Sequence, residues 1–373
     1  MKERAMATSS ELAEKQRRVN KFLESKGCDA LLLGRVDNFA WFTGGGHDHV
    51  SLAAEAGVAA LLVHRDRKTL ITNNVERPRL MDEEIAEQGF EEEIAPWSGD
   101  DLAPVVKRLC AGEKIASDVN LPVPGLTACP SDIARLRWSL TPEEVARYRA
   151  LGREVGEAMG EACMSLQPGM TEHEAAAAIA GEHYRRGVAP VVVLVAADDR
   201  LLKYRHPIPT DNKVKRTVML VVCGRRHGLI ASATRIVSFG PVSKELARKH
   251  RAAVEVDGAL NAATRPGTRI GDVFKKGLAA YAAQGFAEEW KLHHQGGPTG
   301  YATREYRATA ETDHLVEPNQ AFAWNPSIAG TKSEDTIIAT RQGPEIISAS
   351  PGFPTIEVKA EGLTLERPDI LER

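Results

Sequence analysis

Hydrophobic positions in the first part of the chain recur with two different periods. Between 9 and 26 they return every three or four residues, which places Leu12, Val19 and Leu23 on one face of a helix. Short apolar runs at 29–33, 59–64, 69–72 and 115–118 are typical of strands, and 76–88 has a helical pattern. Helices and strands in this alternating order predict an α/β unit.

Two longer apolar runs lie in the second half of the chain, at 218–223 and 229–239, and both are rich in β-branched residues. The sequence Gly-Arg-Arg-His-Gly at 224–228 separates them, so we predict a β-hairpin with its turn in this break. Each run is almost continuously apolar, which is typical of strands that are covered on both faces.

Two predicted helices carry the same capping signal at their first residues. The sequence Thr141-Pro142-Glu143-Glu144 predicts a helix that begins after Thr141 and runs to about 166. Thr171 and Glu174 have the spacing of a second capping box.

The second of these helices has a counterpart further along the chain. Helices predicted between Pro168 and Gly187 and between Pro266 and Gly285 each span nineteen positions from proline to glycine, and a β-rich stretch follows each. Such a repeat predicts a pseudo-twofold domain with a site where the halves meet. The proline-rich stretch 122–130 is the predicted linker, which gives domains at 1–130 and 131–373.

Composition narrows the class of protein. The chain has 373 residues, of which 43% are hydrophobic and 27% charged, as in globular proteins with two substantial cores. A net charge of −3 without a basic stripe argues against nucleic acid as a partner. No apolar run approaches the roughly 20 residues of a membrane span, and the N-terminus lacks a signal-peptide pattern, so we expect a cytoplasmic protein without a membrane partner. The five scattered cysteines fit reduced thiols rather than a disulfide framework or a zinc site.

The stretch Thr217–Gly240 resembles the central hairpin of the creatinase/aminopeptidase P/prolidase family, the pita-bread enzymes. Gly228-Leu229 and Ser232-Ala233-Thr234-Arg235 match its G-Y and S-D-x-T-R elements, and Asn38–Gly44 matches an N-x-x-W-x-T-G box of the family's N-terminal domain. The resemblance covers nearly the whole chain. It implies fold class α/β (α+β), with a creatinase-like N-terminal α/β domain followed by a pseudo-twofold pita-bread catalytic domain. The box also fits a buried aromatic cluster under a turn.

The resemblance also identifies positions at which the family binds a pair of divalent metals with two Asp, one His and two Glu. The matching residues here are Val221, Ser232, His294, Asn325 and Glu334. Only His294 and Glu334 keep a ligand of the family's type, whereas a catalytic ion usually takes at least three protein ligands. The resemblance therefore implies no metal and no other cofactor.

Three residues in matching motifs are candidates for catalysis. His206 lies between Arg205 and Pro207 on a loop stiffened by prolines, where the metal-free creatinase of the family has an acid–base His. Its ordinary pKa of about 6.5 would let it act in either direction, although a histidine bonded to loop backbone is the structural alternative. His294 and Glu334 are expected to form a second acid–base couple, since burial raises a carboxyl pKa unless His294 or an Arg pairs with it.

Further residues are candidates for substrate binding. Arg205, Arg235 and Arg304 could hold a carboxylate in a bidentate fork, although each could equally be a surface or structural arginine. The glycine-rich loop after His294 lets backbone approach a ligand closely and lacks the Walker and Rossmann patterns. The other members of the predicted substrate-binding set are Ser232, Gly296, Gly297, Tyr301 and Asn325.

We therefore predict a metal-independent pita-bread enzyme that acts on a small polar amide, amidine or amino-acid-like substrate by His/Glu acid–base chemistry. C–N hydrolysis and a related elimination or cyclisation are both open, and so is the substrate. The alternatives are a non-catalytic binding protein on the same fold and an Xaa-Pro aminopeptidase or dipeptidase with a degenerate metal site. The resemblance further implies a homodimer in which Phe39–His49 of one chain lines the partner's pocket, because that loop shows no evident need within its own chain.

Overall fold

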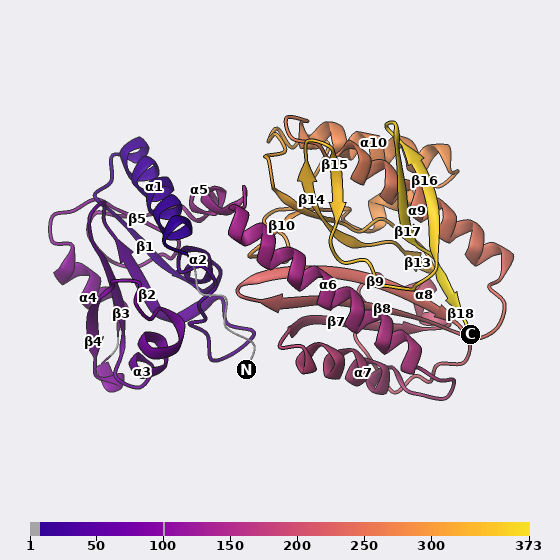
Figure 1. Cartoon of the computed structure of the whole chain (residues 1–373), viewed down its shortest axis with the longest axis horizontal. Helices are drawn as coiled ribbons and strands as arrows, with labels where there is room; N and C mark the ends of the chain where they lie inside the picture. Colours follow the sequence, from indigo (N-terminus) through magenta and orange to yellow (C-terminus); the bar gives the residue numbers. More distant parts are fainter. Residues whose placement is uncertain (1–7, 100) are drawn as a thin grey trace. The chain divides into compact units, whose positions relative to one another are not determined.

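The computed structural model describes residues 8–99 and 101–373, and the chain divides into two compact units (Figure 1). The first unit ends at Arg137 and the second begins at Trp138. The helical elements of the first unit are α1 (Ser9–Lys26), α2 (Val36–Phe42), α3 (Arg77–Arg79), η1 (Leu80–Glu84), η2 (Trp97–Gly99), α4 (Leu102–Leu109), α5 (Pro130–Ala134) and η3 (Arg135–Arg137). Its strands are β1 (Ala30–Arg35), β2 (Ala56–Val63), β3 (Lys68–Asn73), β4 (Glu91–Ala95), β5 (Ile115–Ser117) and β6 (Leu126–Ala128).

The strands of the first unit form one mixed sheet in the order β4-β3-β2-β1-β5-β6. Its core packs apolar residues of the central strands, such as Leu32 and Leu62, against Val106 of α4. The predicted α/β character of this region is confirmed, and α1 covers the range that its apolar period predicts.

Three predictions for this unit need correction. The helix expected at 76–88 is a single turn, α3, followed by the π-helical turn η1, and Ile85 leaves helical geometry with φ −129°. The predicted linker at 122–130 contains β6, which pairs in parallel with β5 and so belongs to the sheet. The box Asn38–Gly44 runs from α2 into the turn after it, and Phe39 and Trp41 are fully buried within their own unit, as the alternative of a buried aromatic cluster predicts. The aromatic part of the box therefore has a packing role in its own chain, contrary to the reason given for a partner contact.

The second unit contains longer helices and a second sheet. Its helical elements are α6 (Pro142–Ser165), α7 (Glu172–Arg185), α8 (Asp199–Lys203), α9 (Lys244–Ala263), α10 (Ile270–Ala283) and η4 (Glu289–Leu292). Its strands are β7 (Ala189–Ala197), β8 (Thr217–Arg226), β9 (Leu229–Ser238), β10 (Gly296–Thr299), β11 (Ala321–Trp324), β12 (Ser327–Ile328), β13 (Thr331–Lys332), β14 (Asp335–Thr340), β15 (Gly343–Ile346), β16 (Thr355–Ala360), β17 (Leu363–Pro368) and β18 (Ile370–Glu372). The main sheet has the order β10-β11-β14-β9-β8-β7, with β15 beside β14 and β18 beside β9.

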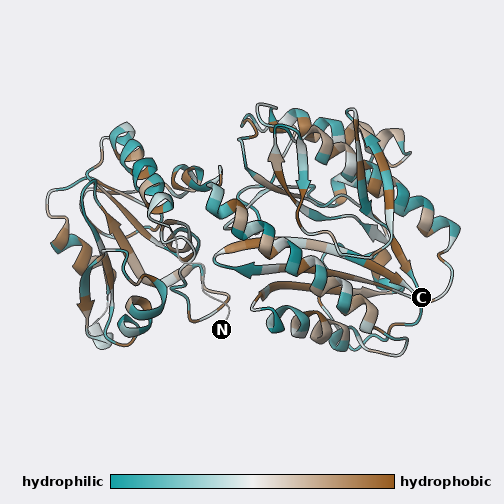
Figure 2. Ribbon diagram, viewed as in Figure 1, coloured by the Kyte–Doolittle hydropathy of each residue, from teal (hydrophilic) through white to brown (hydrophobic). Residues whose placement is uncertain are grey.

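The predicted hairpin is confirmed as β8 and β9, but its turn is shorter than expected. The strands continue through Arg226 and resume at Leu229, so His227 and Gly228 alone make the turn. Both have positive φ, 52° and 75°, which suits a two-residue turn of the type that matches strand twist. In Figure 2 the strands β7 and β8 are largely hydrophobic, whereas α7, which packs on β7, alternates between hydrophilic and hydrophobic residues.

The predicted repeat, with helices at 168–187 and 266–285, corresponds to a structural repeat. The capping boxes of Thr141 and Thr171 are both present. Gly169 and Gly267 have φ of 93° and 90°, and their N–H groups donate to the carbonyls of Val214 and Val316 at 2.8 Å in each case. Because β7-β8-β9 and β10-β11-β14 are the two halves of the main sheet, they meet where β9 pairs with β14.

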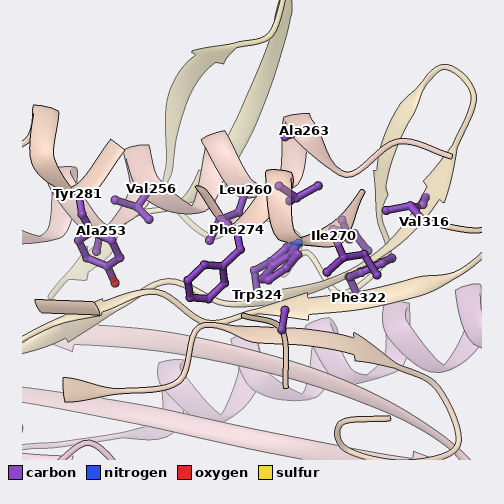
Figure 3. Packing of buried hydrophobic residues seen from close by; sticks show 14 of the residues in the cluster. Ala253, Val256, Leu260, Ala263, Ile270, Phe274, Tyr281, Val316, Phe322 and Trp324 are labelled. Atoms are coloured by element: carbon purple, nitrogen blue, oxygen red, sulfur yellow. The ribbon is translucent and has the colours of Figure 1, made fainter. Parts of the chain in front are cut away.

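A hydrophobic core supports the second half of this sheet (Figure 3). Val256 and Leu260 of α9 and Phe274 of α10 pack above Phe322 and Trp324 of β11. The rings of Phe322 and Trp324 stack with centroids 5.7 Å apart, and Trp324 Nε1 donates to Thr264 Oγ1 at 2.9 Å. This packing holds β11, which leads directly to Asn325. Among the described residues, no helix is long and apolar enough to cross a membrane.

Asp48 is an unusual charge in the first unit, because its side chain is fully buried and its carboxylate oxygens have no hydrogen-bond partner within residues 8–99 and 101–373. Burial raises the pKa of Asp48 to about 8. The pKa of this carboxyl is about 4 in the unfolded chain and higher in the folded one. Its contribution to stability is therefore complete below about pH 4 and is lost as the pH rises through the pKa of the folded state.

We therefore expect wild-type stability to fall relative to Asp48→Asn between about pH 4 and pH 8, and the variant to be more stable by about 1 kcal/mol or more at pH 8. Denaturant unfolding at several pH values measures this difference. Asp66→Asn, at an exposed acid, is the control and should follow the wild-type profile. Parallel profiles for wild type and Asp48→Asn would show that Asp48 does not titrate as described.

Candidate functional site

The candidate site lies on one face of the main sheet, where β9 meets β14. Register pairs Val221 of β8 with Thr234 of β9 and with Leu194 of β7, so these side chains share a face. Glu334 immediately precedes β14, and its carboxylate accepts from Thr234 Oγ1 at 2.8 Å. The sheet therefore presents an apolar floor beside one buried carboxylate.

Glu334 is held by two cations as well as by the threonine. Lys332 Nζ lies 2.6 Å from Glu334 Oε2, and Arg304 Nη2 donates to Glu334 Oε1 at 3.0 Å. Lys332 and Glu334 are only 5% and 2% exposed, so the ion pair is shielded from water. Burial opposes the charge on Glu334, but Lys332 and Arg304 outweigh it and lower its pKa to about 2.

A short hairpin explains why Lys332 reaches this position. β12 and β13 pair antiparallel around Ala329 and Gly330, which places Ser327 opposite Lys332. Gly330 has φ 103°, a conformation that side chains rarely adopt. The hairpin thus carries Lys332 on one strand and, on the other, Ser327, whose hydroxyl contacts a histidine.

Three imidazoles cluster beside this hairpin. His293 Nε2 lies 3.1 Å from His206 Nε2, and the ring centroid of His294 lies 4.6 Å from that of His293 and 5.6 Å from that of His206. His293 and His294 come from the segment between η4 and β10, whereas His206 comes from the loop after α8. Tertiary structure therefore joins two segments that are almost ninety positions apart in the sequence.

The loop that carries His206 is anchored on both sides. Val195 N–H donates to the carbonyl of Pro207 at 3.2 Å, and Thr210 N–H donates to Glu172 Oε2 at 3.0 Å. These bonds, together with the fixed φ of proline, support the predicted stiffness of the loop. His206 itself remains exposed, so a ligand can reach it.

His293 is positioned from the hydrophobic core. Tyr281, at the end of α10, accepts from Ser327 N–H at 2.8 Å through its hydroxyl, and Ser327 Oγ lies 3.0 Å from His293 Nδ1. Arg205 Nη1 donates to the same Ser327 Oγ at 3.1 Å. The orientation of the His293 ring therefore depends on α10 and on the β12 hairpin.

All three imidazoles are held in their neutral form. Burial and the charge of Lys332 lower the pKa values of His206 and His293, and burial and Arg304 lower that of His294 to about 4. At neutral pH these rings can accept a proton, but they lack the additional proton that an imidazolium could donate. This corrects the expectation that His206 acts equally well as acid and base.

The expected couple of His294 and Glu334 also needs correction. The partners of Glu334 are Lys332, Arg304 and Thr234, and its lowered pKa makes it a fixed anion rather than a proton donor. The condition stated from sequence, that an arginine would keep the carboxyl ionised, is the one met here.

Two of the predicted arginines lie at the site and one does not. Arg205 forms an ion pair with Glu289 beside His206, and Arg304 contacts Glu334 as described. Arg235 points elsewhere: it is 2% exposed, and its guanidinium donates to Asp335 Oδ1 at 2.9 Å and to backbone carbonyls. We therefore correct Arg235 to a structural arginine.

Tyr301, Gly296 and Gly297, three of the predicted substrate-binding residues, make contacts within the chain. Tyr301 is buried, and its hydroxyl donates to Glu144 Oε1 at 2.6 Å, at the first turn of α6. A Cβ on Gly296 would lie 2.2 Å from the carbonyl oxygen of Ala323, and one on Gly297 2.8 Å from that of Tyr306. The glycines therefore make room for neighbouring backbone, which corrects the expectation that they make room for a ligand.

Ser232 and Asn325 differ in whether their polar side-chain atoms already have a partner within the chain. Ser232 is fully buried with its Oγ 3.2 Å from Cys223 Sγ. Asn325 is 3% exposed, and its Oδ1 has no hydrogen-bond partner in the part of the chain that the structure describes. A buried acceptor without a partner is unfavourable, so Asn325 is the better candidate for a ligand contact.

Sequence reasoning missed His293 and Lys332. His293 stands directly before the residue that matches the family motif, and Lys332 stands two positions before Glu334. Alternate positions of an extended segment share a face, which was the available signal for Lys332. No local pattern shows that His293 meets His206.

The pair of divalent ions that the family binds does not fit these residues. Val221 offers no ligand atom, and the Glu334 carboxylate already holds the ammonium of Lys332 and the guanidinium of Arg304. Two fixed cations beside the carboxylate disfavour a further pair of metal ions there.

Comparison with known proteins agrees with the fold. Residues 146–341, more than half of the chain, match metallopeptidase family M24, and residues 15–149 match the creatinase/prolidase N-terminal domain. A probable dipeptidase PepE of Mycobacterium tuberculosis is 24% identical over 281 residues, which cover 69% of this chain and 75% of that protein.

Solved structures share the fold over nearly the whole chain. The dipeptidase PepE from Mycobacterium ulcerans has a TM-score of 0.77 at 21% identity and covers 95% of this chain and 99% of that one. The Xaa-Pro dipeptidase from Bacillus anthracis has a TM-score of 0.76 at 18% identity, with coverage of 94% and 99%.

Fold and site together define a two-unit protein of the pita-bread class, with a creatinase-type N-terminal domain. The chain belongs to metallopeptidase family M24, the family of creatinase, aminopeptidase P and prolidase. This confirms the resemblance and the fold class. The family model and the two kinds of dipeptidase named above support a hydrolase of the peptidase class.

The buried pair of Lys332 and Glu334 can be tested by stability. Lys332→Met removes one partner of a shielded ion pair and should lower the free energy of unfolding by roughly 3 kcal/mol, as is typical when a buried charge loses its partner. Lys291→Met is the matched control, because Lys291 is 54% exposed and its pair with Glu288 should be worth about 1 kcal/mol or less.

Adding Glu334→Gln to Lys332→Met should recover part of the loss, because it removes the carboxylate left without its ammonium. Denaturant unfolding of the three variants and the wild type measures these differences. Equal effects of the two lysine substitutions would contradict the buried pair.

Proposed function

We propose that the pocket around the three imidazoles hydrolyses the C–N bond of a small dipeptide or dipeptide-like amide that carries a carboxylate. The observation that carries this is the juxtaposition of neutral imidazoles with fixed, buried cations. The names of the relatives favour the dipeptidase alternative over the creatinase-like reaction predicted first, and nothing in them supports metal independence.

Charge supports an anionic group on the substrate. The cations that act on the imidazoles outnumber the anions paired with them by two: Arg205, Arg304, Arg307 and Lys332 against Glu289 and Glu334. A surplus of positive charge in a partly buried pocket attracts anions. Arg304 Nε is buried and has no partner within the described residues, so it is the donor we assign to the substrate carboxylate.

The neutral imidazoles support a base. His206 is exposed, anchored and unprotonated, so it can take the proton of an attacking water. Asn325 Oδ1, the buried acceptor, is placed to receive an N–H of the substrate. Lys332 and Glu334 are held in place by their ion pair, so their charges need no reorganisation during the reaction.

A panel of Xaa-Pro and other dipeptides, scored for release of free amino acids, tests the proposal. With any substrate found, His206→Ala should lower kcat by about 10²–10⁴-fold, the usual contribution of a positioned acid or base, with little change in thermal midpoint. His173→Ala, at an exposed histidine outside the cluster, is the control. Retention of more than about a third of kcat by His206→Ala would exclude the role of His206 as base. Absence of turnover across the panel would favour the non-catalytic alternative.

We also propose that the chain is a homodimer located in the cytoplasm. Since Phe39 and Trp41 are buried in their own unit, the contact with a partner is assigned to the residues that follow the box. Val50 and Leu52, two positions apart, are 70% and 41% exposed, so they offer apolar surface for this contact.

Light scattering should therefore give twice the chain mass of 40.5 kDa at micromolar concentration. Val50→Asp should shift the equilibrium toward monomer, because it places a charge in an apolar contact. Val75→Asp, at another valine that is 60% exposed, is the matched control and should leave the mass unchanged. A monomeric wild type would reject this proposal.

A further inference from the structure

The three imidazoles form a cluster that the family's ligand pattern does not include. One ring nitrogen from each of His206, His293 and His294 lies within 4.8 Å of the others. His206 Nε2 and His293 Nε2 are the closest pair, at 3.1 Å. A tetrahedral zinc ion with bonds of about 2.0–2.1 Å holds its ligand atoms roughly 3.3–3.4 Å apart. The spacing of this pair is therefore close to that of two zinc ligands.

We infer that His206, His293 and His294 form a binding site for one divalent transition-metal ion, with Zn²⁺ the best fit. Three histidines with one open position are a ligand set that zinc uses in proteins. The site is distinct from the carboxylate-rich pair site of the family, because only His294 is common to both.

The groups around the trio support this assignment. Ser327 Oγ lies 3.0 Å from His293 Nδ1, which leaves Nε2 directed at His206. Metal-binding histidines typically bond through their other nitrogen in this way, and the bond fixes both tautomer and ring direction. Tyr281 in turn accepts from Ser327 N–H at 2.8 Å, so the hydrophobic core supports the arrangement.

Accessibility differs among the three rings in a way that suits an entry path. His293 is 7% exposed and fixed, His294 is half-buried, and His206 is exposed. An ion can therefore reach the cluster from the side of His206, and the small shift needed to bring the third nitrogen closer falls on the less buried rings.

Charge around the trio determines which ions it can take. The facing charged groups are Lys332, Arg304, Arg205, Arg307, Glu334 and Glu289. Each carboxylate among them is already paired with a cation, so no free carboxylate supports a hard ion. Imidazole nitrogens suit Zn²⁺, Cu²⁺, Ni²⁺ and Co²⁺, whereas Mg²⁺ and Ca²⁺ prefer oxygen. The surplus of positive charge opposes the ion itself, so the site requires an anion at the open position.

This inference does not depend on the proposed hydrolysis, because binding is measured without substrate. A His206 nitrogen that holds the ion cannot also act as base, so the two roles belong to different states of the chain. The untagged chain, stripped with a chelator, is titrated with ZnCl₂ by calorimetry, and zinc is then determined after dialysis. We expect about one Zn²⁺ per chain. When MgCl₂ replaces ZnCl₂, we expect no Mg²⁺ to remain bound after dialysis.

Variants identify the ligands. His206→Asn and His293→Asn should each weaken Zn²⁺ binding by more than the roughly 10–100-fold that loss of a supporting group alone causes, and Ser327→Ala should fall in that range. His206 is exposed, so its variant should fold even if His293→Asn does not, and circular dichroism checks both. With Co²⁺ in place of Zn²⁺, a strong visible band in the wild type that disappears in His206→Asn would indicate nitrogen ligands in tetrahedral geometry.

Two controls cover other places where zinc could bind. His173→Ala removes an exposed histidine, and Cys110→Ser removes the thiol that lies with His64 and Glu113 in the first unit. Both variants should bind Zn²⁺ like the wild type. Absence of zinc binding by the wild type, or unchanged binding by His206→Asn and His293→Asn, would overturn the inference.

Discussion

Two consecutive buried acids, Glu334 and Asp335, connect the halves of the second unit. Their side chains leave opposite faces of the sheet, as successive residues of an extended segment must. Glu334 is held by Lys332 and Arg304, and Asp335 by Arg235 at 2.9 Å and by Arg367 at 3.0 Å. Burying a carboxylate costs several kcal/mol unless it is well paired, so these cations must all be in place together. They come from β9, β13, β17 and the segment around Arg304, which the two acids thereby hold together.

The face that carries Glu334 became the candidate site because of what surrounds it. Leu194 and Val221 provide an apolar floor, which keeps the local dielectric low and strengthens each charge interaction. The same environment keeps the imidazoles neutral beside permanent cations. A member of a metallopeptidase family thus has Val221, Ser232 and Asn325 where the family has acidic ligands, and fixed side-chain charges beside a histidine cluster.

Much of the architecture was predictable because its signals are local. The capping boxes of α6 and α7, the hairpin β8–β9 and the paired helices α7 and α10 each follow from residues within a few positions of one another. The predictions were wrong where residues distant in the sequence determine the local structure. The stretch with β6 appeared to be a linker because its prolines break regular structure locally, but pairing with β5 makes Leu126–Ala128 a strand. The aromatic residues of the box appeared free for a partner because their core neighbours lie elsewhere in the sequence.

The candidate site shows the same division. The sequence by itself determined the family, the two-unit order, the loss of the acidic ligands at Val221, Ser232 and Asn325, and the stiff loop around His206, because these depend on residue identity and local backbone limits. Only the tertiary structure decided that Arg235 faces away, that Lys332 rather than His294 pairs with Glu334, and that His293 meets His206. The physical reason is that side-chain direction and burial follow from strand register and packing among distant segments, and these set both the charge of each group and its partners.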